Sequence, residues 1–413
     1  MKILHFSTGF PLSFQGGITN YVRMLARVQK EKGNDVWVIG GEDDKKYEFN
    51  YIQYKSKYIE PFTLGKMEDK MALNKIDAFL KKEKFDIIHI HMILDVDWDL
   101  YNILKNYNYI ISLHDYFYLC PKIFMIDRKK KLCDKYEESH CKKCIDKIEQ
   151  YRYSRFIRRN FIFDITFSDN ITILRYQKMK KLLEGAKILL PVSKRVKEIY
   201  MKSGIDNKYM VSHIGNILAD KYKPFIKNKK EVYKRKINIA MMGSLSYLKG
   251  GDVFIKLAEQ IDRNKFNIFF YGRSGKYKSK MKKIGIIDKG VYKQENLDKI
   301  LSNIDLGLVL SIWEDNAPQV VMEFLNNNVP VVGTKMGGIP DFINTENGYL
   351  FNPYLEEDWI NLIKFFNNIS LEKILELKQN IKPTITTNKH YEELMDLYNG
   401  IYSINNRGEN FEI

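Results

Sequence analysis

The chain has 413 residues, a length that favours two domains over a single core. Hydrophobic residues make up 45% and charged residues 29%, which is the composition of a folded globular protein and excludes a disordered one. The net charge of +16 favours anionic partners such as nucleotides or lipid headgroups, unless most of the excess is solvated surface. No apolar run approaches the roughly 20 residues that span a bilayer, and the first residues are too polar for a signal sequence. We therefore expect a cytoplasmic protein that reaches a membrane only peripherally.

The first predicted elements are a strand over residues 3–8, a helix after Gly16 and Gly17, and a strand over 36–39. This order predicts a βαβ unit whose helix ends at Gly33. The three spaced glycines of the dinucleotide fingerprint are missing. Gly16 and Gly17 are thus either a packing turn or one wall of a phosphate site.

Two further predicted strands carry histidine at or just beyond their carboxyl ends. The run 85–91 ends in His91, and the strand 109–113 is followed by His114. Ligands of open α/β sheets gather beyond the carboxyl ends of the strands. Two such histidines on neighbouring strands predict a cleft at this edge.

All four cysteines lie in a predicted insertion of about residues 117–165: Cys120, Cys133, Cys141 and Cys144. A reduced compartment makes a disulfide framework improbable. The Cys-x-x-Cys spacing of the last two would suit two corners of a tetrahedron. The sequence leaves two alternatives open, a structural zinc site and free thiols.

The same insertion is strongly basic. Residues 122–160 contain thirteen Lys or Arg and six Asp or Glu, with aromatic residues between them. Such a segment can rest on an anionic membrane surface or bind single-stranded nucleic acid. It can also be a solvated helical face whose lysines cover apolar surface with their aliphatic stems.

After a lysine-rich candidate linker over 219–236, a second run of alternating strands and helices follows. Its first strand, 237–242, leads into Gly243 and a loop with Lys249, and its second, 266–271, leads into Arg273. Alternation on both sides of one linker predicts an α/β fold with two doubly wound parallel sheets facing each other. We expect domains over 1–218 and 219–386, followed by a helix and a loose tail over 387–413.

The most informative stretch runs from Trp313 to Thr334. It predicts a loop, a helix beginning near Pro318 with Asn316 as its cap, and a buried strand over 329–332. Helical periodicity places Glu323 on the face opposite the core. Asp315 precedes it by eight positions, in a loop whose helix N-terminus favours an anion. Two carboxylates therefore bracket a predicted phosphate cradle.

Together these motifs resemble the retaining glycosyltransferases of family 4, which have the two-domain GT-B fold with two Rossmann-like domains across a cleft. The resemblance covers nearly the whole chain and is most specific from Trp313 onward. It rests on Gly16-Gly17, the strand ending in His91, Leu113-His114-Asp115, Pro191-Val192-Ser193, Gly243, Lys249-Gly250, Asp315, Glu323 and Gly337-Gly338-Ile339-Pro340.

The resemblance implies a role for each matching residue. Glu323 matches the glutamate that holds the ribose hydroxyls of a nucleotide sugar, and Lys249 matches the lysine that neutralises its diphosphate. Asn316 and Ala317 would offer backbone N–H groups to the donor. His114 matches the strand-end histidine that approaches the donor sugar from the N-terminal domain.

Further donor contacts are implied at Gly16, Gly17 and Gly243. The family often has Arg directly after the last of these glycines, whereas this chain has Ser244, so Arg273 is a candidate replacement. Asp315 stands where the family usually has glutamate, although the neighbouring Glu314 offers another register.

The resemblance also implies that the last helix crosses back to the N-terminal domain, with residues near 390–403 belonging spatially to it. Asp95 and Asp97 could be read as the metal-binding carboxylate pair of the other large glycosyltransferase fold, but the surrounding organisation is wrong for that fold. No cofactor or catalytic metal is expected, because a lysine and a helix N-terminus supply fixed positive potential.

The leading interpretation is a metal-independent retaining transferase, such as a hexosyltransferase. It would move a sugar from a nucleotide-diphosphate donor to a glycan or polyprenol-linked acceptor in cell-surface polysaccharide synthesis. Its expected partners include an anionic membrane surface and exclude nucleic acid. The alternatives are a nucleotide-sugar 2-epimerase of the same fold and a catalytically silent subunit that binds nucleotide or glycan.

Overall fold

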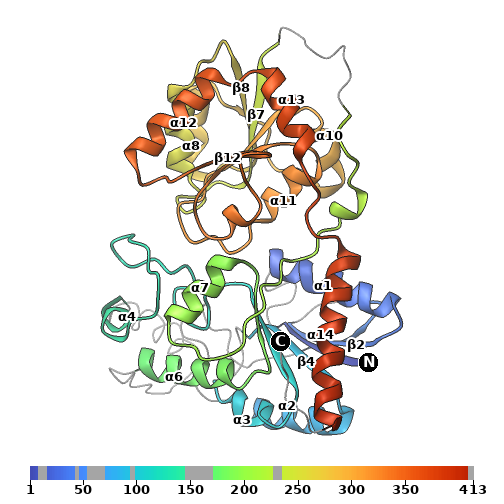
Figure 1. Cartoon of the computed structure of the whole chain (residues 1–413). Coiled ribbons are helices and arrows are strands. Elements are labelled where there is room, and N and C mark those ends of the chain that lie inside the picture. Colours follow the sequence, from blue (N-terminus) through green and yellow to red (C-terminus); the bar gives the residue numbers. More distant parts are fainter. Residues whose placement is uncertain are drawn as a thin grey trace. The chain divides into compact units, whose positions relative to one another are not determined.

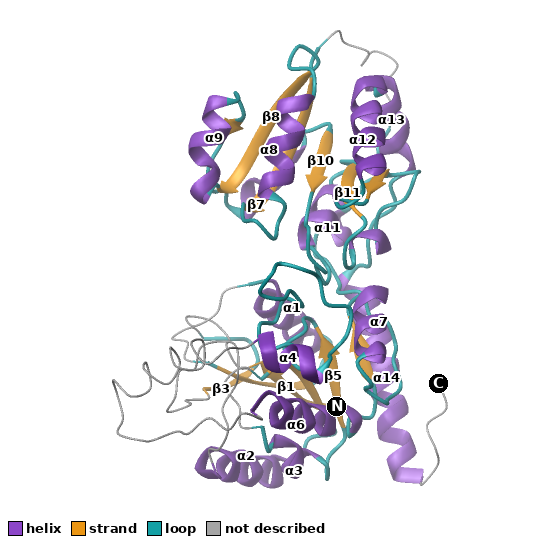
Figure 2. Cartoon of the chain, turned by 90° about the vertical axis from the view of Figure 1, so that its left-hand side faces the viewer, coloured by secondary structure: helices purple, strands orange, loops and turns teal. Residues whose placement is uncertain are grey.

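The computed structural model describes residues 1–7, 16–41, 46–53, 70–93, 98–144, 171–226 and 235–407. These form two compact units (Figure 1). The first comprises Met1–Ile214 together with Asn388–Ile413, and the second comprises Gly215–Thr387. In each unit helices flank a set of strands (Figure 2).

The first unit is built on a six-stranded sheet in the order β3-β2-β1-β4-β5-β6, in which every neighbouring pair is parallel. Its strands are β1 (Lys2–Ser7), β2 (Asp35–Gly40), β3 (Asn50–Gln53), β4 (Ile87–Met92), β5 (Tyr109–Leu113) and β6 (Leu189–Pro191). All residues of β4 and β5 are buried, as expected of central parallel strands that are covered on both faces.

Helices connect these strands. They are α1 (Gly17–Glu31), α2 (Lys70–Glu83), α3 (Leu100–Leu104), α4 (Glu138–Cys144), α6 (Ile171–Glu184) and α7 (Lys194–Lys202). The first turn of α1 is stabilised by Thr19, whose Oγ1 accepts the Gly16 N–H at 3.1 Å and donates to the Gly16 carbonyl. The long helix α14 (Thr387–Arg407) packs on this unit although it closes the chain; for example, the Asn34 side chain donates to the Tyr391 hydroxyl.

The second unit has a six-stranded parallel sheet in the order β12-β11-β10-β7-β8-β9. Its strands are β7 (Ile237–Ser244), β8 (Phe266–Arg273), β9 (Ile287–Asp288), β10 (Leu306–Val309), β11 (Val331–Thr334) and β12 (Gly348–Phe351). Its α-helices are α8 (Gly251–Gln260), α9 (Lys278–Lys283), α10 (Leu297–Leu301), α11 (Gln319–Asn326), α12 (Glu356–Asn368) and α13 (Leu371–Asn380).

Two hydrophobic clusters cover the two faces of this second sheet. One joins α8 and α12 to the sheet through Phe254 and Phe366, and the other joins α10 and α11 through Leu297 and Phe324. A sheet with core on both faces is doubly wound. The predicted fold class, two Rossmann-like parallel-sheet units, is therefore confirmed.

None of the described helices has the length and apolar character that would let it cross a membrane.

Candidate functional site

The carboxyl ends of β7, β8 and β10 define one edge of the second sheet. The last residues of β7 and β8, Ser244 and Arg273, are register partners on neighbouring strands. The Arg273 side chain is exposed at this edge. Arg273, the proposed replacement for the arginine that the family often has at position 244, thus lies on the strand next to that position.

A partly buried ion pair joins the two loops that leave β7 and β10. Lys249 Nζ lies 2.5 Å from Asp315 Oδ2, and the Ser311 hydroxyl donates to the same oxygen at 2.7 Å. The Asp315 side chain is only 7% exposed, whereas that of Lys249 is 42% exposed. Lys249 Nζ also lies 5.6 Å from the centre of the Trp313 ring. The ammonium group is therefore anchored on a buried carboxylate and still accessible to a ligand.

Gly250 permits this approach of the two loops. Its φ of +81° is a left-handed conformation, and a Cβ at this position would lie 1.8 Å from the Leu310 carbonyl oxygen. The Ile312 N–H donates to the Leu248 carbonyl at 2.9 Å, which fixes the loops side by side. Lys249 is positioned by this backbone contact.

The glycine pair after β11 packs against the acidic loop. The Gly338 N–H donates to the Asp315 carbonyl at 2.7 Å, and the Gly337 N–H donates to Glu314 Oε2 at 3.1 Å. Both carboxylates are buried, but Asp315 faces Lys249 while Glu314 faces the glycine loop. The neighbouring acidic residues therefore have different partners.

Glu323 is buried, which contradicts the prediction that it points away from the core. Helix α11 is covered on that side by the segment after β9, where Tyr292 and Gln294 hydrogen bond to the Glu323 carboxylate. Burial raises the pKa of Glu323, and these two hydrogen bonds partly oppose the rise. Sequence periodicity missed Tyr292 and Gln294, because β9 is only two residues long and gives no alternating pattern.

Helix α11 starts near Pro318, as predicted, but its cap residue differs from the prediction. Pro318 is the N-cap residue in extended conformation, the helix begins at Gln319, and Asn316 makes no capping hydrogen bond. Within the described residues, Asn316 Oδ1 and Glu323 Oε2 are buried and have no hydrogen-bond partner. Buried polar atoms normally have partners, so these two oxygens are candidate ligand contacts.

The remaining predicted donor contacts lie in the first unit. Gly16 and Gly17 form the start of α1, and His114 follows directly after β5. His114 is 8% exposed, and burial lowers its pKa to about 3, so its imidazole is neutral. Residues 8–15, which precede these glycines, lie outside the described residues.

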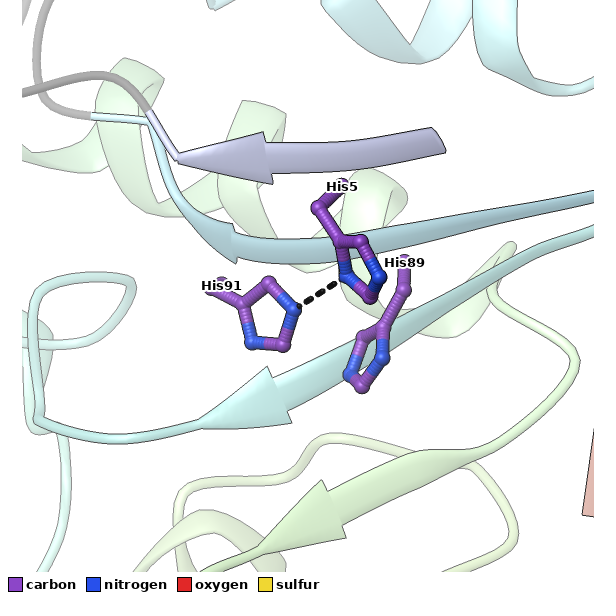
Figure 3. Close-up of side chains that lie close together, drawn as sticks. All are labelled: His5, His89 and His91. Atoms are coloured by element: carbon purple, nitrogen blue, oxygen red, sulfur yellow. Dashed lines mark hydrogen bonds between the residues drawn. The ribbon is translucent and has the colours of Figure 1, made fainter. Parts of the chain in front are cut away.

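Three histidines of the first unit form the one described group whose potential metal-ligand atoms all lie within 4.8 Å of one another: His5, His89 and His91 (Figure 3). His5 comes from β1, and the other two come from β4. His89 Nδ1 contacts the Tyr398 hydroxyl at 2.6 Å and His89 Nε2 contacts Ser112 Oγ at 2.7 Å. Both nitrogens of this ring already have hydrogen-bond partners, which favours a hydrogen-bonded cluster over a metal site.

None of the four cysteines forms a disulfide in the described chain, and all four are partly buried. The Lys122 and Met125 N–H groups donate to the Cys120 sulfur, while Cys133 Sγ lies 3.8 Å from His140 Nε2. Burial and the neighbouring thiols raise the pKa of Cys133 to about 12 and that of Cys141 to about 11. Around a zinc ion, thiolate ligands lie about 3.8 Å from one another. In the described chain no three of the cysteine sulfurs lie within even 4.8 Å of one another.

Several sequence predictions fall on residues that the structure does not describe. These are the carboxylate pair Asp95 and Asp97, the part of the basic insertion beyond residue 144, residues 227–234 of the candidate linker, and the tail beyond residue 407.

Two family models match consecutive parts of the chain. Residues 15–159 match "Glycosyltransferase Family 4", and residues 223–384 match "Glycosyl transferases group 1". Comparison with curated protein sequences gives no match.

The fold is similar to that of several solved structures. HepE from Anabaena in complex with UDP has a TM-score of 0.64 and 13% identity, over 97% of this chain and 100% of that chain. A glycosyltransferase from Rickettsia africae has a TM-score of 0.64 and 16% identity, over 97% and 98%. WaaG, a glycosyltransferase involved in lipopolysaccharide biosynthesis, has a TM-score of 0.59 and 15% identity, over 96% and 100%.

Proposed function

We propose that this chain, which belongs to the glycosyltransferases of the family 4 type, is a retaining, metal-independent transferase acting in cell-surface polysaccharide synthesis. Its donor would be a nucleotide-diphosphate sugar and its acceptor a glycan or lipid-linked glycan. The assignment of a nucleotide-diphosphate sugar as donor is based on the side chains in and next to residues 311–323. This segment contains Asp315, which pairs with Lys249, and two buried oxygens that have no hydrogen-bond partner in the described part of the chain, Asn316 Oδ1 and Glu323 Oε2.

The nucleotide would be held by Glu323. Its Oε2 has no partner within the described residues, and ribose hydroxyls are donors that a buried carboxylate accepts well. Tyr292 and Gln294 would fix the orientation of the carboxylate by their hydrogen bonds. Burial makes this site sensitive to the loss of either partner.

The diphosphate would meet cationic and N–H groups at the sheet edge. Lys249 and Arg273 supply the positive charges there, and Gly243 is the last but one residue of β7. The backbone N–H groups of Asn316 and Ala317 precede α11, whose N-terminus favours an anion. Fixed charges of this kind stabilise a leaving diphosphate without a metal ion.

The transfer step would exchange two bonds at the anomeric carbon of the donor sugar. The bond to the diphosphate oxygen breaks as the bond to the acceptor hydroxyl oxygen forms on the same face. A phosphate oxygen of the leaving group takes the proton of the acceptor hydroxyl. Asp315 would lie toward the sugar and hold Lys249 in place, and His114 would contact a sugar hydroxyl.

The acceptor assignment is supported by charge. The described part of the basic insertion, between Lys122 and Cys144, is largely exposed and rich in lysine. Such a surface suits a polyprenol-diphosphate or an anionic leaflet at the inner face of the membrane. Similarity to WaaG, which takes part in lipopolysaccharide biosynthesis, is consistent with a cell-surface glycan.

The test begins with binding, using UDP-glucose first because HepE binds it. A panel of nucleotide sugars is screened for thermal stabilisation, since a ligand that binds the native state raises the apparent stability. The donor found is then incubated with glycan and polyprenol-linked acceptors, and the anomeric configuration of the product is read by NMR.

Each alternative function predicts its own result. A glycoside with retained configuration, formed with chelator present, supports the proposal. Conversion of the donor to its 2-epimer without acceptor would instead indicate an epimerase. Tight donor binding without turnover under any acceptor would indicate a silent subunit.

A further inference from the structure

Five of the seven histidines are buried in the first unit: His5, His89, His91, His114 and His390. His89 and His91 are two positions apart on β4 and therefore face the same side of the sheet. His5 is the register partner of His89 on the neighbouring strand. The group of rings on this side of the sheet continues to His114, which directly follows β5.

Three of these rings form a continuous hydrogen-bonded chain that begins at Gln29 of α1. Gln29 Oε1 lies 2.6 Å from His5 Nε2, and His5 Nδ1 lies 2.9 Å from His91 Nε2 (Figure 3). His91 Nδ1 then lies 3.1 Å from His114 Nε2. The strand-end histidine is thus connected through two buried rings to a single side-chain amide.

The rings of this chain are neutral. Burial lowers the pKa of His5 to about 4 and that of His114 to about 3, and the pKa of His91 is also well below its usual value. A neutral imidazole has one N–H donor and one lone pair. Whichever nitrogen donates in the first ring therefore determines the direction of every later bond.

Gln29 sets that direction. Its carbonyl oxygen, Oε1, faces His5 Nε2 and can only accept a hydrogen bond. His5 Nε2–H consequently donates to Gln29, and His5 Nδ1 accepts. His91 Nε2–H then donates to His5, and His114 Nε2–H donates to His91. The remaining nitrogen of the last ring, His114 Nδ1, carries a lone pair.

His89 lies beside this chain without belonging to it. Its ring centre is 3.9 Å from that of His91, but its two nitrogens contact Tyr398 and Ser112. It is as deeply buried as the rings of the chain. His89 therefore offers a matched control for any substitution in the chain.

We propose that Gln29, His5 and His91 are positioning residues that fix the ring of His114 in the Nε2–H tautomer, so that His114 Nδ1 accepts a hydrogen bond from a hydroxyl group of the bound sugar. This inference rests on the proposed function, which places His114 beside the sugar. It assigns a positioning role to three residues of the first unit and a polarity to the contact that His114 makes. A sugar hydroxyl would be recognised there as a donor.

The tautomers can be read directly in the full chain. Long-range proton–nitrogen NMR on protein labelled with nitrogen-15 in histidine distinguishes Nδ1–H from Nε2–H rings, and single substitutions assign the signals. We expect His5, His91 and His114 all to be protonated on Nε2. An Nδ1–H tautomer at His114 in the unsubstituted protein would overturn the proposal, and this result requires neither a variant nor turnover.

Two variants then test the role of the chain. Gln29→Met removes the acceptor with little change in volume, and His91→Gln interrupts the chain. Both should give His114 a mixed tautomer and lower kcat about tenfold, the effect of one lost hydrogen bond, with unchanged nucleotide Kd. His89→Gln should leave the His114 signal unchanged.

If His89→Gln and His91→Gln change the His114 tautomer equally, the hydrogen-bonded chain does not determine that tautomer. Gln29, His5 and His91 would then have only a packing role. Failure of the proposed function looks different. In that case no donor is turned over by any form of the protein, although the NMR signals still report the tautomers.

Discussion

Lys249 and Asp315 form an ion pair with 2.5 Å between Nζ and Oδ2, and this pair ties the loop after β7 to the loop after β10. The carboxylate is buried and the ammonium group is partly exposed. Burial of the anion alone would be unfavourable, so the pair depends on both members. The same lysine that would face the diphosphate thus also neutralises the acidic loop.

Replacing Lys249 should therefore damage catalysis more than binding. We expect Lys249→Met to lower kcat by about 100-fold or more, because one fixed charge that stabilises the leaving group is lost. Steady-state kinetics with the identified donor measure this change. Lys278→Ala removes an exposed lysine of α9 and should leave kcat unchanged. A Lys249 variant with full kcat would exclude this residue from the site.

Glu323 and Asp315 should separate binding from transfer. Glu323→Ala should raise the Kd for the nucleoside diphosphate by about 10- to 100-fold, because ribose loses hydrogen bonds to a charged acceptor. Asp315→Ala should mainly lower kcat. Calorimetry and transfer rates give the two quantities, and the exposed Glu346→Ala serves as control. The assignment fails if both variants keep full activity.

Gly337 should tolerate no side chain. Its φ is +54°, and a Cβ would lie 2.0 Å from the Asp315 carbonyl oxygen. Gly337→Ala should lower Tm and kcat together by displacing the acidic loop. Gly290 has a φ of +70° but no atom within 4 Å of its Cβ position. Gly290→Ala should then show only the backbone cost of about 1–2 kcal/mol, and equal losses in the two variants would contradict this explanation.

The buried histidines should make the first unit sensitive to acid. Burial lowers the pKa of His5 and His390 from 6.5 to about 4, so the unfolded chain takes up protons that the folded chain does not. The free energy of unfolding should be constant above pH 6.5 and fall between pH 6.5 and about 4. Each of these two rings contributes on the order of 3 kcal/mol to that fall.

Urea unfolding measures this dependence. Trp37 and Trp98 report on the first unit once Trp313 and Trp359 of the second unit are replaced by Phe. His390→Gln should make the pH dependence less steep. Stability that stays flat from pH 6.5 to 4.5 would show that these rings are not held neutral.

The four cysteines give a prediction about metal. If they hold zinc, protein purified without chelator contains one zinc per chain, and Cys141→Ser reduces it. Binding would draw the sulfurs closer than they lie here and would lower the pKa values that burial now raises, because metal binding requires thiolates. Elemental analysis decides between the alternatives, and absence of stoichiometric zinc would indicate free thiols.

The fold class could be predicted from the sequence because strands and helices alternate with strong patterns. The run around Ile88, with its β-branched and histidine positions, and the run around Val332 predict strands that are buried on both faces, as central parallel strands are. The same reasoning failed at Glu323. Periodicity identifies the face of a helix that points away from the sheet, but it cannot tell whether another segment covers that face.

The candidate site could be predicted only where residues are close in sequence or lie at strand ends. Asp315 and Lys249 were both identified, but their contact depends on the order of β7 and β10 in the sheet. Tyr292 and Gln294 were missed because they follow β9, a strand of two residues that gives no alternating pattern. The hydrogen-bonded chain from Gln29 to His114 was also not predicted, because Gln29 and His5 are brought together by tertiary packing alone.

Helix α14 has a consequence for synthesis of the protein. His390 contacts Tyr21 at 2.7 Å, and Tyr398 contacts His89, so the last helix completes a core whose other residues are translated first. The second unit, Gly215–Thr387, is translated in between, which takes roughly 10 to 35 s at typical elongation rates. During that time the nascent first unit exposes the face that α14 covers in the finished protein. The second unit can therefore fold earlier than the first, and the growing chain presents a surface that chaperones recognise until α14 leaves the ribosome.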